Sequence, residues 1–162
     1  MKAAVLTVSD RVSRGEAADG SGDTLAELLE ADGYDVVRRV VPDEADEIAA
    51  AIAALACDAA LVLTTGGTGV APRDVTPEAT RTAIDREVPG IAEALRASSV
   101  AKTPHGLLSR GVAGIRGATL VVNLPGSTGG CRDGYAVLRP ALGHALSLLR
   151  DEPTHLQQTP VS

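Results

Sequence analysis

Short apolar runs alternate with alanine-rich runs of helical periodicity along most of the 162-residue chain. Strands are predicted at Ala3–Ser9, Tyr34–Val41 and Ala59–Thr64. Helices are predicted at Asp23–Asp32, from Asp43 or Glu44 to Ala56, at Pro77–Arg86 and at Ile91–Ser99. Strands that alternate with helices typically form a mainly parallel sheet with helices on both faces. We therefore expect an α/β fold, in one domain over residues 1–150.

The pattern changes in the second half of the chain. Leu107–Ile115 and Ala118–Leu124 are separated by Arg116-Gly117 alone, which predicts a small antiparallel strand pair. A long amphipathic helix from about Cys131 to Arg150 is expected to kink or break at Pro140. The polar residues 151–162 are predicted to form a loosely ordered tail.

The aromatic content restricts both the core and the partners. Phe and Trp are absent, and Tyr34 and Tyr135 are the only aromatic residues, so the core must be aliphatic. Proteins that bind single-stranded nucleic acid stack bases on aromatic side chains, and nucleic-acid binders usually carry a basic face. Because this chain has few aromatics and a formal net charge of −6, we expect no nucleic-acid partner.

Cysteine usage and hydropathy point to the cytoplasm. Cys57 and Cys131 lack metal-ligand spacing and are predicted to be small buried or half-buried thiols. The sequence shows no signal-peptide pattern and no apolar run of membrane-spanning length. We therefore expect a cytoplasmic protein without membrane association.

A glycine-rich loop, Thr64-Thr65-Gly66-Gly67-Thr68-Gly69, directly follows the strand predicted at Ala59–Thr64. Its glycines let the backbone turn sharply and let N–H groups approach a ligand closely. Thr76-Pro77-Glu78 then predicts a helix start in which Thr76 is the hydroxyl cap. A strand, a glycine loop and a helix N-terminus together form an anion-binding site. The alternative interpretation of the glycines is a tight strand-to-helix turn without a ligand.

Polar or glycine-rich residues end four of the predicted strands. They are Ser9-Asp10, Pro42-Asp43-Glu44, the glycine-rich loop and Asn123-Leu124-Pro125-Gly126-Ser127. The carboxyl ends of parallel strands meet at one edge of a sheet, and ligands bind there. We therefore expect these segments to converge on a single pocket.

Two acids, Asp43 and Asp74, are the candidate reactive groups. Carboxylates beside a phosphate-binding loop would repel a phosphate unless a hard cation such as Mg²⁺ lay between them. This reasoning favours phosphoryl or nucleotidyl transfer. Taken singly, Asp43 could instead be a helix cap and Asp74 a turn-forming residue.

Other catalytic signatures are absent from the sequence. There is no P-loop motif, no dinucleotide-binding glycine spacing and no nucleophilic triad. His105 is either a pocket residue or a surface-loop residue, whereas His144 and His155 are predicted to be structural or solvated. Asp19-Gly20-Ser21-Gly22-Asp23 predicts a polar loop beside Arg11 and Arg14, which is either a lid or a flexible surface segment.

Five segments, in order, resemble the MogA/MoaB family, which has the molybdopterin-binding fold of molybdenum cofactor biosynthesis. They are Val8-Ser9-Asp10-Arg11, Pro42-Asp43-Glu44, Thr64 through Pro77, Leu108-Ser109-Arg110 and Asn123-Leu124-Pro125-Gly126-Ser127. The resemblance covers roughly Ala3 to Leu149, and the glycine loop with Arg73-Asp74-Val75-Thr76-Pro77 is its most specific part.

The resemblance implies a molybdopterin adenylyltransferase, which uses Mg-ATP to place AMP on the terminal phosphate of molybdopterin and releases pyrophosphate. It implies that Asp43 and Asp74 are the essential acids and hold Mg²⁺. It places Ser109 and Arg110 on the pterin side. The full set of nucleotide- and pterin-binding residues that it implies is Ser9, Asp10, Thr65, Gly66, Gly67, Thr68, Gly69, Ser109, Arg110, Pro125, Gly126 and Ser127.

The same resemblance implies a homotrimer, with hexamers in the MoaB branch, and the molybdenum-insertion protein as a further partner. Arg73-Asp74-Val75-Thr76-Pro77 is MogA-like, whereas Gly126 to Arg132 is closer to MoaB-like chains, so the subfamily stays open. Two other functions are consistent with the resemblance. One is a MoaB-like protein that binds molybdopterin without turnover, and the other is a nucleotide hydrolase of the competence-protein type.

Overall fold

The computed structural model describes residues 1–151. Its elements, in chain order, are β1 (Lys2–Val8), α1 (Asp10–Ser13), α2 (Gly20–Ala31), β2 (Asp35–Val41), α3 (Ala45–Ala56), β3 (Leu61–Thr65), α4 (Thr76–Ala83), β4 (Arg86–Glu87), α5 (Pro89–Lys102), the 3-10 helix η1 (Pro104–Leu108), β5 (Ala113–Arg116), β6 (Thr119–Leu124) and α6 (Thr128–Leu149). The predicted polar tail lies, from residue 152 onward, outside the described residues, as does His155.

The strands form one six-stranded sheet in the order β2-β1-β3-β6-β5-β4. The first four strands in this order are mutually parallel. β5 runs antiparallel to β6, and the two-residue β4 runs antiparallel to β5. The expected α/β class, with a mainly parallel sheet and a small antiparallel part, is therefore confirmed.

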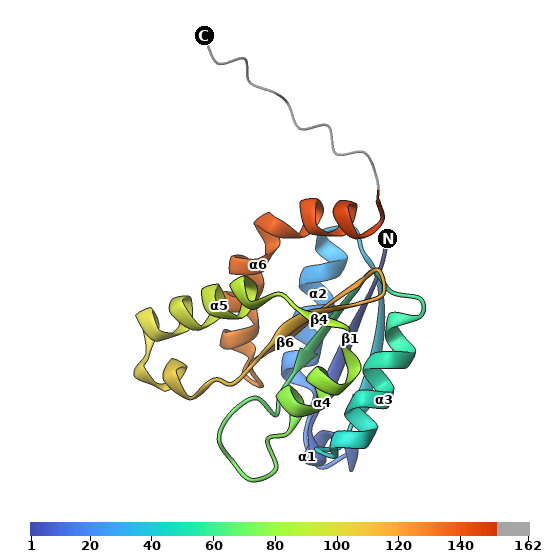
Figure 1. Cartoon of the computed structure of the whole chain (residues 1–162). Helices are drawn as coiled ribbons and strands as arrows, with labels where there is room; N and C mark the ends of the chain where they lie inside the picture. The colour runs from blue at the N-terminus through green and yellow to red at the C-terminus, as the bar shows by residue number, and fades with distance from the viewer. Residues whose placement is uncertain (152–162) are drawn as a thin grey trace.

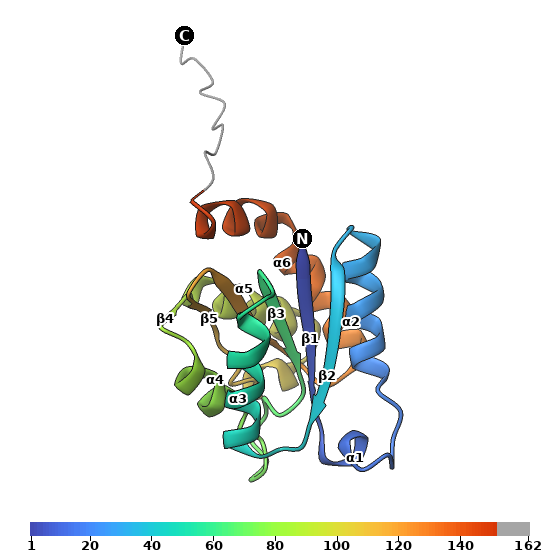
Figure 2. The ribbon, with the colours of Figure 1, turned by 90° about the vertical axis from the view of Figure 1, so that its right-hand side faces the viewer.

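Helices cover both faces of this sheet (Figures 1 and 2). On one face, Val5 and Leu63 pack in a cluster with Leu25 of α2 and Leu142 of α6. On the other face, α3 and α4 pack over the alternate strand residues, such as Leu6. Because side chains alternate across a strand, a central strand covered on both faces must be apolar throughout. This accounts for the uninterrupted apolar runs of β1 and β3.

The carboxyl ends of the four parallel strands lie at the same edge of the sheet. Val8 is in register with Val41, and Thr65 is in register with both Thr7 and Leu124. Figure 2 shows β1 and β2 running side by side toward α1 at this edge. The four polar strand ends thus gather at one edge as predicted, but the expected single pocket is wrong, because two cavities lie there and Pro42-Asp43-Glu44 line neither of them.

The first helical segments differ from the prediction. The segment Asp19–Asp23 is not a loop, because the Asp19 carboxylate accepts a hydrogen bond from Gly22 N at 3.1 Å and starts α2 at Gly20. Ser9 likewise caps α1, a single turn that the sequence analysis missed. An N-cap side chain satisfies an orphan N–H group at a helix start, so it can extend a helix into glycine-rich sequence.

The strand predicted at Leu107–Ile115 is wrong over its first half. Residues Pro104–Leu108 form η1, and β5 begins only at Ala113. Gly106 packs so closely on α5 that a Cβ there would lie 2.6 Å from Val100 N. This contact holds the segment against α5 and away from the sheet.

Three further expectations have outcomes in the structure. Cys131 is buried as predicted, but Cys57 is exposed at the end of α3, which corrects its assignment as a buried or half-buried thiol. The long helix runs through Pro140 without a break, and Figure 1 shows its axis changing direction between its orange and red parts. Within residues 1–151, no helix combines the length and the apolar content that crossing a membrane requires.

A charged cluster joins the end of α2 to α6. Asp32 accepts hydrogen bonds from the Tyr135 hydroxyl at 2.7 Å and from Arg139 Nε at 2.7 Å and Nη2 at 2.6 Å. The hydrogen bonds from Arg139, and then that from Tyr135, lower the pKa of the Asp32 carboxyl below its ordinary value of 3.8. The ionised form of Asp32 therefore stabilises the folded state.

Replacing Asp32 with asparagine is expected to lower the melting temperature at neutral pH. Because the pKa of Asp32 is depressed on folding, its stabilising contribution is complete above the ordinary value of 3.8 and is lost as the pH falls through the lower folded value. Melting curves of both proteins at a series of pH values would check this. A difference in melting temperature that vanished well above pH 3.8 would contradict it.

Candidate active site

Two cavities flank the loop Pro125–Ser127 at the carboxyl edge of the sheet. The first has a volume of about 550 Å³ and lies between α5, η1 and the start of α6. The second has a volume of about 440 Å³ and lies between α1, the start of α2 and the start of α6. We call them the α5–α6 cavity and the α1–α2 cavity. Ser127 lines both of them.

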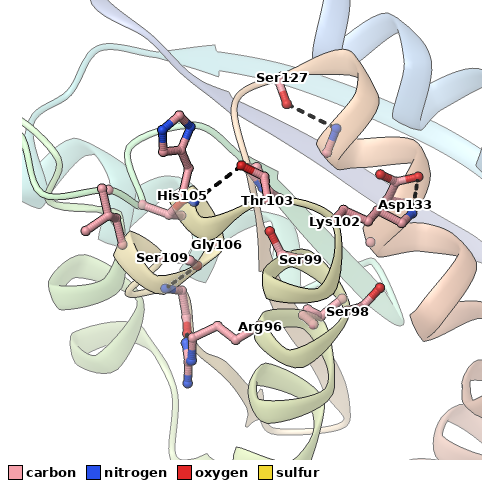
Figure 3. A pocket seen from close by; sticks show the side chains of 18 of the residues that line it. Arg96, Ser98, Ser99, Lys102, Thr103, His105, Gly106, Ser109, Ser127 and Asp133 are labelled. Atoms are coloured by element: carbon pink, nitrogen blue, oxygen red, sulfur yellow. Dashed lines mark hydrogen bonds and ion pairs between the residues drawn. The ribbon is translucent and has the colours of Figure 1, made fainter.

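The lining of the α5–α6 cavity combines glycines and apolar residues with hydroxyl groups and a few charges (Figure 3). Lys102 of α5 and Asp133 of α6 face each other in it and form an ion pair at 2.8 Å. Arg96 donates from Nη1 to Gly111 O at 2.7 Å. The hydroxyl-bearing residues of its lining are Thr68, Ser98, Ser99, Thr103, Ser109 and Ser127.

The α1–α2 cavity is lined largely by backbone and small side chains. It contains the starts of two helices, with Gly20 and Ser21 from α2 and Ser127 and Thr128 from α6. Arg11 also contributes to its lining. Helix N-termini carry partial positive charge and free N–H groups. The Asp19 carboxylate also lines the cavity but is paired with Arg38 at 2.8 Å, so the cavity still favours an anionic ligand.

The glycine-rich loop is anchored between these cavities and α4. Thr76 donates its hydroxyl hydrogen to Gly66 O at 2.9 Å and its N–H to Gly67 O at 3.1 Å. The prediction that Thr76 caps the helix is therefore wrong, because Val75 is the N-cap and the Thr76 hydroxyl binds the loop. The Thr65 hydroxyl donates to Pro125 O at 2.7 Å and ties the two loops together.

Asp43 and Asp74 both lie directly beside the glycine-rich loop. A Cβ on Gly67 would lie 3.2 Å from Asp43 Oδ1, and a Cβ on Gly69 would lie 2.9 Å from Asp74 Oδ2. Glycine at these two positions thus leaves room for the carboxylates against the backbone. The structure brings together the two acids that the sequence analysis singled out.

Asp43 binds Asp10, the first residue of α1, and does not cap α3. Asp43 Oδ2 accepts from Asp10 N at 2.9 Å, and Asp10 Oδ1 accepts from Asp43 N at 3.0 Å. Glu44 is the N-cap residue of α3, so the alternative interpretation of Asp43 as a helix cap is wrong. Asp74 does close a turn, because its Oδ2 accepts from Ala71 N at 3.0 Å.

The carboxylates of this cluster affect one another. Burial raises the pKa of Asp43, and the negative charges of Asp10 and Asp74 raise it further. The hydrogen bond from Asp10 N acts in the opposite direction and lowers this pKa. The pKa of Asp10 is lowered, chiefly by Arg73, whose Nε lies 2.6 Å from Asp10 Oδ2. The negative charge at Asp43 is therefore only partly compensated.

The carboxylates of Asp43 and Asp74 suit Mg²⁺ only together with a bound phosphate-containing molecule. Among residues 1–151, no three His, Cys, Asp or Glu side chains are arranged to hold a metal ion by themselves. Mg²⁺ is commonly held by one or two carboxylates together with substrate phosphates and water. Asp43 and Asp74, beside a loop suited to phosphate, fit that pattern, and their role as metal ligands stays a prediction.

The other predicted site residues divide between the two cavities. The α1–α2 cavity is lined by Ser9, Thr65, Gly66, Gly126 and Ser127. The α5–α6 cavity is lined by Thr68, Gly69, Ser109, Pro125 and Ser127. The residues that line neither cavity are Asp10, Asp43, Gly67, Asp74 and Arg110.

Several cavity residues were missed by the sequence analysis. The helix predicted at Ile91–Ser99 continues to Lys102, so Lys102 and Thr103 were not considered, and Asp133 was not singled out on its helix. A lone lysine near a helix end carries no motif, so these residues had no sequence signal. His105 lines the α5–α6 cavity, which decides between its two interpretations.

Comparison with known proteins agrees with this architecture. Residues 4–144 match a family model described as "Probable molybdopterin binding domain". The chain is 38% identical over 152 residues to a protein named molybdopterin adenylyltransferase from Helicobacter pylori, covering 90% of this chain and 85% of that protein. It is 47% identical to the solved structure of the molybdopterin biosynthesis enzyme MoaB from Thermus thermophilus, covering 94% of this chain and 98% of that chain with a TM-score of 0.87.

Some relatives are much longer than this chain. It is 42% identical over 161 residues to a protein named Gephyrin from Dictyostelium discoideum, covering 92% of this chain but 22% of that protein. The chain spans between 22% and 49% of the length of this and two other curated relatives that it matches. The likeness to these longer proteins therefore concerns one of their parts.

Proposed function

The chain belongs to the molybdopterin-binding domain family, and on this premise we propose that it adenylylates molybdopterin with Mg-ATP in molybdenum cofactor biosynthesis. The observation that carries the proposal is the pair of cavities that meet at Ser127 beside the glycine-rich loop and its two carboxylates. A transfer between two phosphorylated molecules requires both to be held side by side with their reacting groups in contact.

The chemistry of each cavity suggests its ligand. The α5–α6 cavity offers serine and threonine hydroxyls around Lys102, which suit the donors and acceptors of a pterin ring and the charge of its phosphate. The α1–α2 cavity offers two helix N-termini and Arg11, which suit the phosphates of ATP. We assign the pterin to the first cavity and the nucleotide to the second, so that the two phosphate ends meet at Ser127.

The proposed reaction needs no enzyme nucleophile. A terminal phosphate oxygen of molybdopterin attacks the α-phosphorus of ATP, a new phosphorus–oxygen bond forms, and the bond from that phosphorus to the bridging oxygen of the leaving pyrophosphate breaks. The N–H groups of the glycine-rich loop and of the α6 start orient the phosphates in line, which is the main catalytic task in such transfers. Bound near Asp43 and Asp74, Mg²⁺ would neutralise charge on the leaving pyrophosphate.

The remaining parts of the proposal concern assembly and location. We expect a homotrimer, and we expect that the adenylylated product passes to the molybdenum-insertion protein in the cytoplasm. Sedimentation equilibrium of the purified chain checks the trimer, and a monomeric mass at working concentrations would contradict it.

The direct test is incubation of the chain with molybdopterin and Mg-ATP, followed by detection of adenylyl-molybdopterin and pyrophosphate. We expect both products in equal amounts, and neither when molybdopterin is omitted. Tight molybdopterin binding without product would favour a binding protein without turnover. Breakdown of ATP without molybdopterin would favour a nucleotide hydrolase.

A further inference from the structure

Arg110 holds both ends of the segment Gly69–Asp74. Its Nε donates to Gly69 O at 2.7 Å, and its Nη2 donates to Asp74 O at 2.6 Å. Its backbone N–H also donates to Thr68 O at 2.8 Å. Because a guanidinium is planar and rigid, its two contacts set the separation of the two carbonyl groups.

Between these two points the backbone is exposed, and the Arg73 side chain binds Asp10, Asp43 O and Glu44 outside the segment. Val70 is 64% exposed, and Ala71, Pro72 and Arg73 are exposed as well. Within the segment, Asp74 N donates a hydrogen bond to Ala71 O at 2.9 Å, and Ala71 N donates one to Asp74 Oδ2 at 3.0 Å. The direction of the Asp74 carboxylate therefore depends on the contacts of Arg110 at the two ends of the segment, together with those of Arg73 just before Asp74.

The guanidinium does not reach the α5–α6 cavity. Ser109 lines that cavity, whereas Arg110 does not, and the rest of its guanidinium is taken up by an ion pair with Glu78 in the first turn of α4. The hydrogen-bond and ion-pair partners of the Arg110 side chain thus lie on the glycine-rich loop, on the Asp74 segment and on α4.

We propose that Arg110 is a positioning residue that sets the Asp74 carboxylate for the transfer reaction, and that it does not bind the pterin. This inference rests on the proposed function, because it assigns Arg110 a role within the proposed adenylylation site. The ion pair with Glu78 is partly exposed, and such pairs contribute little by themselves, so the two carbonyl contacts carry the positioning.

Three variants test this inference. Arg110→Met removes every side-chain donor but keeps an extended side chain. Arg110→Lys keeps the positive charge on an ammonium group but loses the planar guanidinium. Glu78→Gln removes the acidic partner and leaves the two carbonyl contacts of Arg110 in place. In Arg110→Met we expect kcat for adenylylation to fall about 10²-fold, the cost of a small misplacement of a catalytic group. We expect partial recovery in Arg110→Lys and a near-normal kcat in Glu78→Gln.

Molybdopterin binding separates positioning from pterin contact. The equilibrium dissociation constant for molybdopterin is expected to stay unchanged in Arg110→Met. A weakened molybdopterin affinity with a normal kcat would overturn the inference and support a pterin contact.

Hydrogen exchange provides a readout that does not depend on turnover. The hydrogen-bonded amide hydrogens of Ala71 and Asp74 are expected to exchange faster in Arg110→Met and at an intermediate rate in Arg110→Lys. Unchanged exchange there in both variants would overturn the inference. If the wild-type chain makes no adenylylated product, the proposed function fails, while hydrogen exchange still decides whether Arg110 holds the segment.

Discussion

Replacing Asp74 with asparagine is expected to lower kcat for adenylylation by about 10²–10³-fold, the range found when one group that stabilises transition-state charge is removed. The asparagine side chain keeps an oxygen that can accept the hydrogen bond from Ala71 N, and the contact of Asp74 O with Arg110 involves the backbone only. The fold and the local turn should therefore survive, and the loss should come from the missing charge. Steady-state kinetics at saturating molybdopterin and Mg-ATP give the measurement.

A matched control separates the local charge from a general change in net charge. Asp58→Asn removes the same charge from an exposed carboxylate that pairs with Lys2 at the opposite edge of the sheet, so it should leave kcat unchanged. Equal losses in both variants, or wild-type turnover in Asp74→Asn, would refute the assignment of Asp74 as an essential acid.

The second large effect is expected for Gly66→Ala. Gly66 has φ of +98°, and a Cβ there would lie 2.3 Å from Val8 O, a backbone atom of the neighbouring strand. The strained backbone and the overlap together should cost about 2–5 kcal/mol of stability. Because Gly66 also lines the α1–α2 cavity, any variant that still folds should lose adenylylation. Urea denaturation and the adenylylation assay would measure the two effects.

Gly33→Ala is the matched control for the backbone effect. Gly33 has a similar φ of +88°, but a Cβ there would meet no atom within 4 Å. Its substitution should cost only about 1–2 kcal/mol, the price of the left-handed conformation, and leave adenylylation intact. A loss of stability in Gly66→Ala no greater than that in Gly33→Ala would contradict this prediction, because it would show that the loop can move away from β1 easily.

The parallel part of the fold could be predicted well because its signals are local. A strand that is buried on both faces has a continuous apolar run, as in residues 61–63 of β3, and the flanking helices carry their own periodicity. The segment before β5 could not be predicted in this way. Leu107 and Leu108 resemble the start of a strand, yet Gly106 packs against α5 and directs them into η1, where both are exposed.

The site was predicted in part for the same reason. Ser9, the glycine-rich loop and Pro125–Ser127 all follow predicted strands, so the parallel topology alone brings them to one edge. The α5–α6 cavity needed the packed structure, because Lys102 and Asp133 meet only where α5 lies against α6. Thr76 was identified correctly as important to the loop but was given the wrong contact, since its hydroxyl binds Gly66 O instead of capping the helix.

By itself, the sequence determined the α/β class, the edge at which polar strand ends gather and the two acids beside the glycine-rich loop. These follow from periodicity and from the direction of parallel strands, which depend on neighbouring residues along the chain. Only the tertiary structure decided that the edge holds two cavities that share Ser127, that Asp43 pairs with Asp10, and that Arg110 binds Asp74 O. Those outcomes depend on contacts between residues up to 60 positions apart, as between Thr65 and Pro125, where packing decides which partner each polar group meets.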